Sequence, residues 1–113
     1  MAEQDPNLGL HYGWAFRESG WKPGMDANLK KLGAIVQLSV KSRTSNEPAT
    51  PSDGDRYIHN GGTWSVGSAG DVIVRIAGGW EVFSPAIGWL SYVEDEEVLT
   101  VYKTGGWSTG ISI

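Results

Sequence analysis

The spacing of apolar residues in the N-terminal third of the chain is that of an α-helix. Four of them recur at i, i+4, i+7 and i+11 and so fall on one stripe: Met25, Leu29, Leu32 and Val36. Asp26 lies near the beginning of this segment and Lys30–Lys31 further along, the order of charges that the helix dipole favours. The pattern therefore predicts one amphipathic helix over about residues 24–35.

Beyond the helix, the spacing changes to the period of two that is typical of half-buried strands. Val36–Lys41 alternates apolar and polar residues, with no turn signal to mark where the helix ends. Trp89–Val93 and Val98–Tyr102 predict a hairpin whose loop is the acidic run Glu94–Glu97. In its first strand Trp89, Ser91 and Val93 share one face.

One sequence motif occurs three times: an acidic turn, a short β-type run, a glycine pair and a tryptophan. Its copies are Gly54–Trp64, Gly70–Trp80 and Asp95–Trp107. Paired glycines favour hairpin turns because both adopt positive φ without a Cβ clash. The motif therefore predicts hairpins over about residues 54–110, with each tryptophan at the beginning of a return strand.

These elements predict a mainly β fold with one N-terminal α-helix (α+β), a small hairpin-rich single domain. We expect a flexible N-terminal arm over residues 1–8 and one β-rich domain over 9–113. A chain of 113 residues suits one domain, and its 16 glycines imply many turns. Its 6 tryptophans are many for so small a domain, so some indoles are expected near the surface.

Composition excludes several classes of function. The net charge is −4 and the basic residues are scattered, which argues against nucleic-acid binding. The chain has no cysteine and hence no disulfide or thiolate metal site. No apolar stretch approaches the roughly 20 residues of a membrane span, so no membrane association is expected. The acidic, polar segment Met1–Asn7 does not resemble a signal peptide.

Signals for catalysis or metal binding are weak. His11 and His59 are the two histidines, and neither has a second ligand at metal spacing. Glu94–Glu97 reads as a solvated loop and Asp53–Asp55 as a turn, because the spacing of a calcium loop is missing. Neither a nucleophile elbow nor a phosphate loop occurs. We therefore expect no enzyme, no catalytic residue, no metal and no cofactor.

Trp64, Trp80 and Trp107 have two interpretations. An indole face suits the apolar C–H face of a pyranose, so these residues are candidates for glycan binding. Alternatively, they pack the small β core or a subunit interface, because a small domain needs large side chains to build a core. The packing interpretation is favoured for any single one of them.

Several segments, in order, resemble a known family: Leu8–Leu10, Gly24–Leu32, Val36–Val40, Pro48–Ile58, Gly79–Pro85 and Gly88–Trp89. Across about residues 8–108 the chain is similar to an uncharacterised-function domain of tail-fibre, tailspike and head-appendage proteins from phages, prophages and gene transfer agents. The resemblance implies a non-enzymatic virion structural protein, made in the host cytoplasm, and carries over no catalytic residue.

The resemblance also frames the expected partners. Phage fibres are habitually trimers, so we expect a homotrimer that contacts other virion proteins as a small tail or head appendage or adaptor. Candidate assembly contacts are Leu10, Tyr12, Trp14 and Phe16, because apolar arms suit symmetric assembly. The alternative function is a carbohydrate-binding module that recognises host surface glycans.

Overall fold

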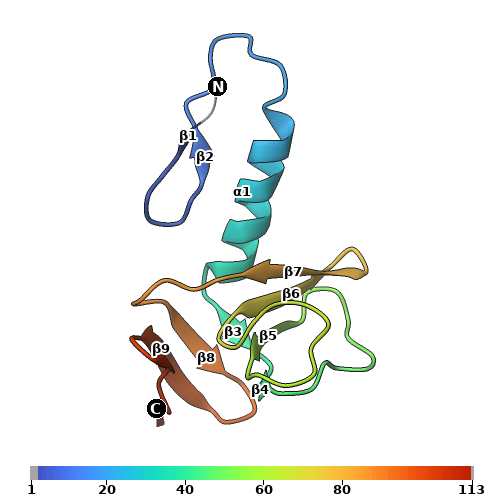
Figure 1. Ribbon diagram of the computed structural model, residues 1–113, viewed down its shortest axis with the longest axis vertical. Coiled ribbons are helices and arrows are strands. Elements are labelled where there is room, and N and C mark those ends of the chain that lie inside the picture. The colour runs from blue at the N-terminus through green and yellow to red at the C-terminus, as the bar shows by residue number, and fades with distance from the viewer. Residues whose placement is uncertain (1–2, 113) are drawn as a thin grey trace. The chain divides into compact units, whose positions relative to one another are not determined.

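The computed structural model describes residues 3–112 (Figure 1). Within them it has one α-helix and eleven short strands. The predicted fold class is confirmed, because the protein is mainly β with its helix near the N-terminus and several antiparallel hairpins. The chain forms two compact units, Met1–Val36 and Gln37–Ile113. The helix belongs to the first unit, and the two larger sheets belong to the second.

The N-terminal unit is a β-hairpin beside a helix (Figure 1). Strand β1 (Glu3–Gln4) pairs antiparallel with β2 (His11–Tyr12), so part of the segment predicted as a flexible arm lies in a strand. The carboxylate of Asp5 closes the turn between them, accepting hydrogen bonds from the backbone N–H groups of Asn7, Leu8 and Leu10. The bond from Leu8 is the main cause that lowers the pKa of Asp5 below its ordinary value.

Helix α1 (Lys22–Ile35) begins two residues before the predicted bound, with Pro23 in its first turn, where a missing N–H leaves no bond unmade. The predicted apolar stripe, however, is only partly buried. Met25 and Leu32 are half-buried, but Leu29 is 60% exposed and Val36 is 61% exposed. Asn28, a polar residue outside the stripe, is buried, so the buried face is turned away from the centre of the stripe.

The physical reason is the surface on which the helix packs. The Asn28 side chain meets the backbone of β2: its Oδ1 accepts from the His11 N–H at 2.6 Å, and its Nδ2 donates to the His11 carbonyl at 2.8 Å. A two-stranded hairpin leaves such backbone groups without a strand partner, and a buried amide satisfies both. Apolar periodicity cannot detect a helix face that is chosen by hydrogen bonding.

The C-terminal unit contains two sheets. One has the order β4-β5-β6-β7, with β4 parallel to β5 and the other pairs antiparallel; its strands are β4 (Arg43–Thr44), β5 (Arg56–His59), β6 (Val72–Ile76) and β7 (Gly79–Phe83). In the other, β10-β9-β8-β3, strand β11 also pairs with β9; its strands are β3 (Ser39–Val40), β8 (Leu90–Val93), β9 (Val98–Lys103), β10 (Gly106–Trp107) and β11 (Ile111–Ser112).

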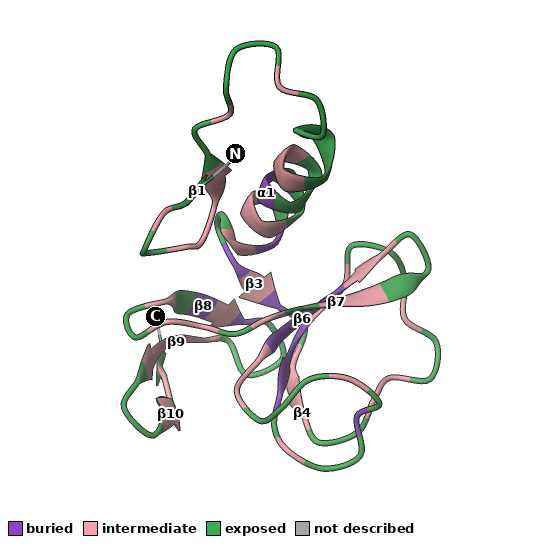
Figure 2. Ribbon diagram, turned by 45° about the horizontal axis from the view of Figure 1, so that its top comes forward, coloured by how far each residue is buried: buried purple, intermediate pink, exposed green. Residues whose placement is uncertain are grey.

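Strands of both sheets contribute to the core of this unit. Figure 2 shows buried positions in β3 and β6. The largest fully buried apolar side chains come from four strands: Val40, Ile58, Val72, Ile73 and Val93. Leu38 and Val40 are the buried members of the alternation predicted over Val36–Lys41, although only Ser39–Val40 forms a strand.

The repeated glycine–tryptophan motif forms a hairpin in two of its three copies. In the second, Ala77 and Gly78 make the turn with φ of 51° and 77°, and Trp80 lies in the return strand β7. In the third, Thr104–Gly105 connects β9 to β10. In the first copy the prediction was wrong, because β5 pairs with β6 across residues 60–71 and Trp64 lies in that loop.

The hairpin with the acidic loop is confirmed. Strand β8 pairs antiparallel with β9, with Ser91 opposite Thr100 and Val93 opposite Val98. Ser91 and Val93 are buried, as expected for residues on one face. The register places Glu94–Glu97 in the connecting turn.

Candidate functional site: a pocket beside Trp107

Trp64 is part of the core. Its ring centroid lies 6.0 Å from that of Tyr57 and 5.4 Å from that of Trp80, and all three rings pack near Ile73. Its Nε1–H donates to the Thr44 carbonyl at 2.9 Å. The indole is therefore enclosed on several sides, and the packing interpretation describes this residue.

Trp80 lies in β7 and is only half-buried, but its ring has neighbours. The guanidinium of Arg75 stands over it at 5.0 Å from the centroid, a cation–π arrangement. Tyr57 and Trp64 approach it in edge-on orientations, with centroids 6.2 and 5.4 Å away. A sugar that stacked on the Arg75 side would first have to displace the guanidinium.

Trp107 is placed differently from the other two. It lies in β10, its Nε1–H donates to the Gly70 carbonyl at 2.8 Å, and Tyr102 packs against it in a T-shaped pair at 5.3 Å. It lines a pocket of about 320 Å³ whose walls include residues of both sheets, among them His59 of β5 and Tyr102 of β9. Of the three candidate tryptophans, Trp107 is the one that borders this pocket.

His59 supplies a polar atom to the pocket wall. Its ring is stacked on Trp64, with centroids 5.6 Å apart and planes at 27°, and only 4% of the residue is exposed. Nδ1 accepts a hydrogen bond from the Gly61 N–H at 3.0 Å, so the ring proton is on Nε2. Within residues 3–112, no protein group bonds to Nε2. In the sequence, His59 was a candidate only as a metal ligand.

Arg43, the first residue of β4, also lines the pocket. Its side chain is only 13% exposed, and it donates to both carboxylate oxygens of Glu96, at 3.1 and 2.7 Å. It also donates to the carbonyls of Ser108 and Thr109, at 2.6 and 2.9 Å. The hydrogen bonds from Arg43 to Glu96 are the main cause that lowers the pKa of the Glu96 carboxyl below its ordinary value. One carboxylate of the predicted solvated loop is therefore half of an ion pair.

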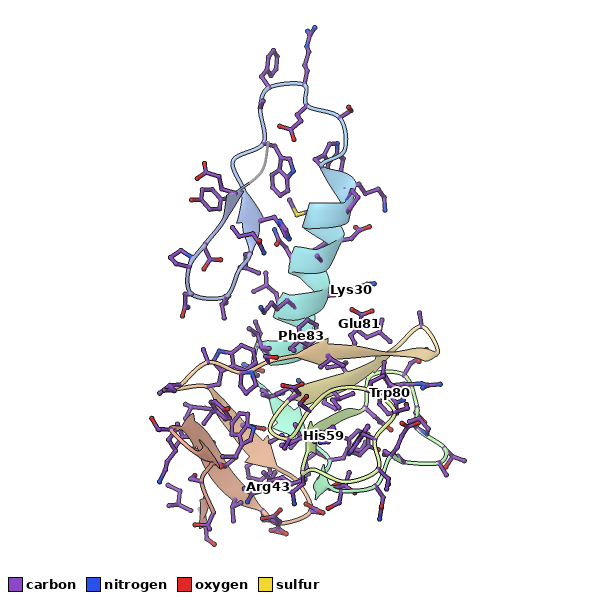
Figure 3. The ribbon with its side chains drawn as sticks, in the orientation of Figure 1. Lys30, Arg43, His59, Trp80, Glu81 and Phe83 are labelled. Atoms are coloured by element: carbon purple, nitrogen blue, oxygen red, sulfur yellow. The ribbon has the colours of Figure 1, made fainter. Side chains whose placement is uncertain are left out.

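Figure 3 shows Arg43, His59 and Trp80 in that order across the C-terminal unit. Arg43 and His59 line the pocket, while Trp64 links His59 to Trp80 through ring contacts. The pocket wall is thus continuous with the aromatic core. Asn60 adds an exposed side-chain amide that forms no hydrogen bond to residues 3–112. Neither Arg43 nor Asn60 was singled out by any sequence pattern.

The predicted assembly residues divide into two kinds. Leu10 and Trp14 are half-buried, and Trp14 packs so closely on α1 that a Cβ at Gly24 would come within 2.9 Å of its ring. Tyr12 is 48% exposed and Phe16 is 90% exposed. Of these four residues, Phe16 thus presents most of its side chain to solvent, and Tyr12 about half.

Phe16 stands at the tip of a tight turn. The Glu18 N–H donates to the Ala15 carbonyl at 3.0 Å, and Glu18 Oε1 accepts from the Ala15 N–H at 2.9 Å. Arg17 has φ of 63°, as the third residue of a type II turn requires. These contacts fix the backbone on both sides of an aromatic ring that is almost fully exposed.

The chain's similarity to known proteins rests on one match. A profile described as "Protein of unknown function (DUF2793)" matches residues 25–108, about three quarters of the chain. The chain belongs to this family. Within the DUF2793 match lie His59, Asn60 and Trp107, whereas the turn of Phe16 precedes it. No curated protein and no solved structure matches the chain.

Residues 3–112 contain no cluster of three or more His, Asp or Glu side chains arranged to hold a metal ion. No helix in that range has both the length and the apolar character needed to cross a membrane.

Proposed function

We propose that this DUF2793 chain is a non-enzymatic structural protein of a phage virion, a small tail or head appendage or adaptor that assembles through its N-terminal unit. The observation that supports the proposal is the exposed apolar surface of that unit. Its large exposed side chains are Tyr12, Phe16, Trp21, Leu29 and Val36. So many apolar side chains in 36 residues are typical of an interaction surface.

The sequence resemblance supplies the setting of the proposal. Its motifs resemble those of phage tail-fibre, tailspike and head-appendage domains, which supports the virion as the site of action. The partners are further copies of the chain, in a homotrimer, and neighbouring virion proteins. The aromatic tip at Phe16 suits such contacts, because its turn is already ordered and little conformational entropy is lost on docking.

Light scattering after size exclusion tests the assembly. One chain weighs 12.2 kDa, and we expect a mass near three chains at micromolar concentration. Phe16→Ala with Trp21→Ala should shift the protein towards the monomer without unfolding it. Ile87→Ala is the matched control, because Ile87 is 70% exposed in the C-terminal unit. Equal association of both variants would contradict docking through the N-terminal unit.

The virion setting needs its own experiment. Particles purified from a culture that carries the gene should contain the chain when their proteins are identified by mass spectrometry. Its absence from intact particles, with the chain present in the cell lysate, would refute the virion role whatever the oligomeric state.

Carbohydrate binding is the second candidate function, and the pocket beside Trp107 favours it. An aromatic side chain and several hydrogen-bonding groups converge on one concave surface, as they do in small-molecule sites. This candidate is compatible with a virion role, since an appendage on a particle meets the surface of its host.

A further inference from the structure

We propose that the pocket beside Trp107 binds one neutral sugar ring, and that the Nε2–H of His59 donates a hydrogen bond to one of its oxygens. The inference rests on carbohydrate binding as the second candidate function. It names the groups that hold the ligand and the class of sugar. It also assigns the binding role to Trp107 alone among the three tryptophans.

His59 offers a hydrogen-bond donor whose orientation is fixed. A side chain that is 4% exposed, with Nδ1 already bonded to Gly61, has a fixed ring orientation and tautomer. His59 lines the pocket, and its remaining N–H has no protein acceptor within residues 3–112. Since no buried side-chain nitrogen or oxygen of the described residues lacks a partner, Nε2 is open to solvent, and a fixed donor in a concave site is suited to a ligand oxygen.

The charge of the pocket selects a neutral ligand. Arg43 is the cationic side chain in its wall, and four of its five N–H donors are used by Glu96 and by two backbone carbonyls. The guanidinium is therefore already neutralised by a carboxylate. An anionic ligand would compete with Glu96 for the same cation, whereas a hydroxyl would not.

Shape and chemistry indicate a sugar rather than an apolar molecule. Trp107 and Tyr102 provide aromatic surface, while His59 and Asn60 provide donors and an amide acceptor. A pyranose has the same combination, with an apolar C–H face and a rim of hydroxyls. The volume of about 320 Å³ is at the small end of the roughly 300–1,000 Å³ typical of ligand pockets, which favours one ring over a long segment.

An NMR titration of the full-length, ¹⁵N-labelled chain tests the proposal. The probes are methyl α-D-glucopyranoside, methyl β-D-galactopyranoside and methyl N-acetyl-β-D-glucosaminide, with glucuronic acid as the charged comparison. We expect at least one neutral glycoside to shift the Trp107 indole N–H and the Gly61 amide, and glucuronic acid to bind more weakly.

Two variants locate the site. In His59→Asn, the new Oδ1 takes the place of Nδ1 as acceptor for Gly61, but the donor towards the pocket is lost, so affinity should fall at least about tenfold. Asn60→Ala changes an exposed rim residue and keeps the proposal testable should His59→Asn misfold. His11→Asn makes the same chemical change in the other unit and should leave affinity unchanged.

The outcomes separate the two claims. Neutral glycosides that bind with equal affinity to the wild type, His59→Asn and Asn60→Ala overturn the pocket assignment but leave carbohydrate binding standing. Binding of glucuronic acid alone overturns the neutral class. If no probe shifts any resonance at high millimolar concentration, both the inference and the second candidate function fail, and the virion role is unaffected.

Discussion

Two glycines of α1, Gly24 and Gly33, should respond in opposite directions to the same substitution. An alanine in place of a helical glycine normally stabilises by about 0.5–1 kcal/mol, because the glycine loses more backbone entropy on folding. At Gly33 no atom lies within 4 Å of a new Cβ, so this gain should be realised. At Gly24 the new Cβ would lie 2.9 Å from Trp14 and 3.3 Å from His11.

The close approach at Gly24 decides the sign. A rigid indole ring cannot yield like the end of a flexible chain, and overpacking of this kind typically costs about 1–3 kcal/mol. Subtracting the helix gain, we expect Gly24→Ala to destabilise the N-terminal unit by about 1–2 kcal/mol. Gly33→Ala should stabilise it by about 0.5–1 kcal/mol.

Amide hydrogen exchange of α1 is the assay, because it reports on this unit without requiring global unfolding. Gly24→Ala should speed exchange of the helix amides about 5- to 30-fold, and Gly33→Ala should slow it up to about fivefold. In a Trp14→Ala background most of the penalty at Gly24 should disappear, because only the approach to His11 remains, as a double-mutant cycle would show. Slower exchange in both single variants would refute the packing of Trp14 on Gly24.

Two further predictions concern polar contacts. Asn28→Ala leaves both backbone groups of His11 without their partner, so the stability of the N-terminal unit should fall by about 2–4 kcal/mol. The His11 amide should also lose its protection from hydrogen exchange. Retained protection would contradict the role of Asn28. Because the folded pKa of Glu96 lies below its ordinary value of 4.5, the Arg43–Glu96 contribution is present above about pH 4.5 and is lost as pH falls through the folded pKa. In Glu96→Gln, the midpoint of urea unfolding should therefore change less with pH in that range than it does in the wild type. Glu97→Gln should keep the wild-type pH dependence.

Local patterns were sufficient where one segment determines its own structure. The β8–β9 hairpin follows from two alternating runs around four acidic residues, and its register places Ser91 and Val93 inside as predicted. The same holds for the existence of α1, whose bounds differ by two residues at most from the prediction. In both cases the signal and the structure span fewer than twenty residues.

Patterns failed where the deciding contact comes from elsewhere in the chain. The buried face of α1 is set by the backbone of His11, 17 residues before Asn28. The orientation of the His59 ring depends on the Gly61 N–H and on the stacked ring of Trp64, neither of which a lone histidine in a sequence reveals. Arg43 reaches Glu96 and Ser108 more than fifty positions later, so only the fold brings its partners together.

The three copies of the repeated glycine–tryptophan motif show how one sequence signal can produce different structures. In the first copy, Gly62 packs against the carbonyl of Ser45, where no Cβ would fit, so this glycine provides close approach rather than a hairpin turn. The chain then continues as a loop in which the ring of Trp64 stacks on that of His59. In the third copy the hairpin does form, and it carries Trp107, so residues of the first and the third copy, His59 and Trp107, line the same pocket. Gly62 and Gly105 both have positive φ, so an alanine strains the backbone at either position, but only at Gly62 would its Cβ also clash, with the carbonyl of Ser45. Replacing Gly62 should therefore disturb the pocket more than replacing Gly105.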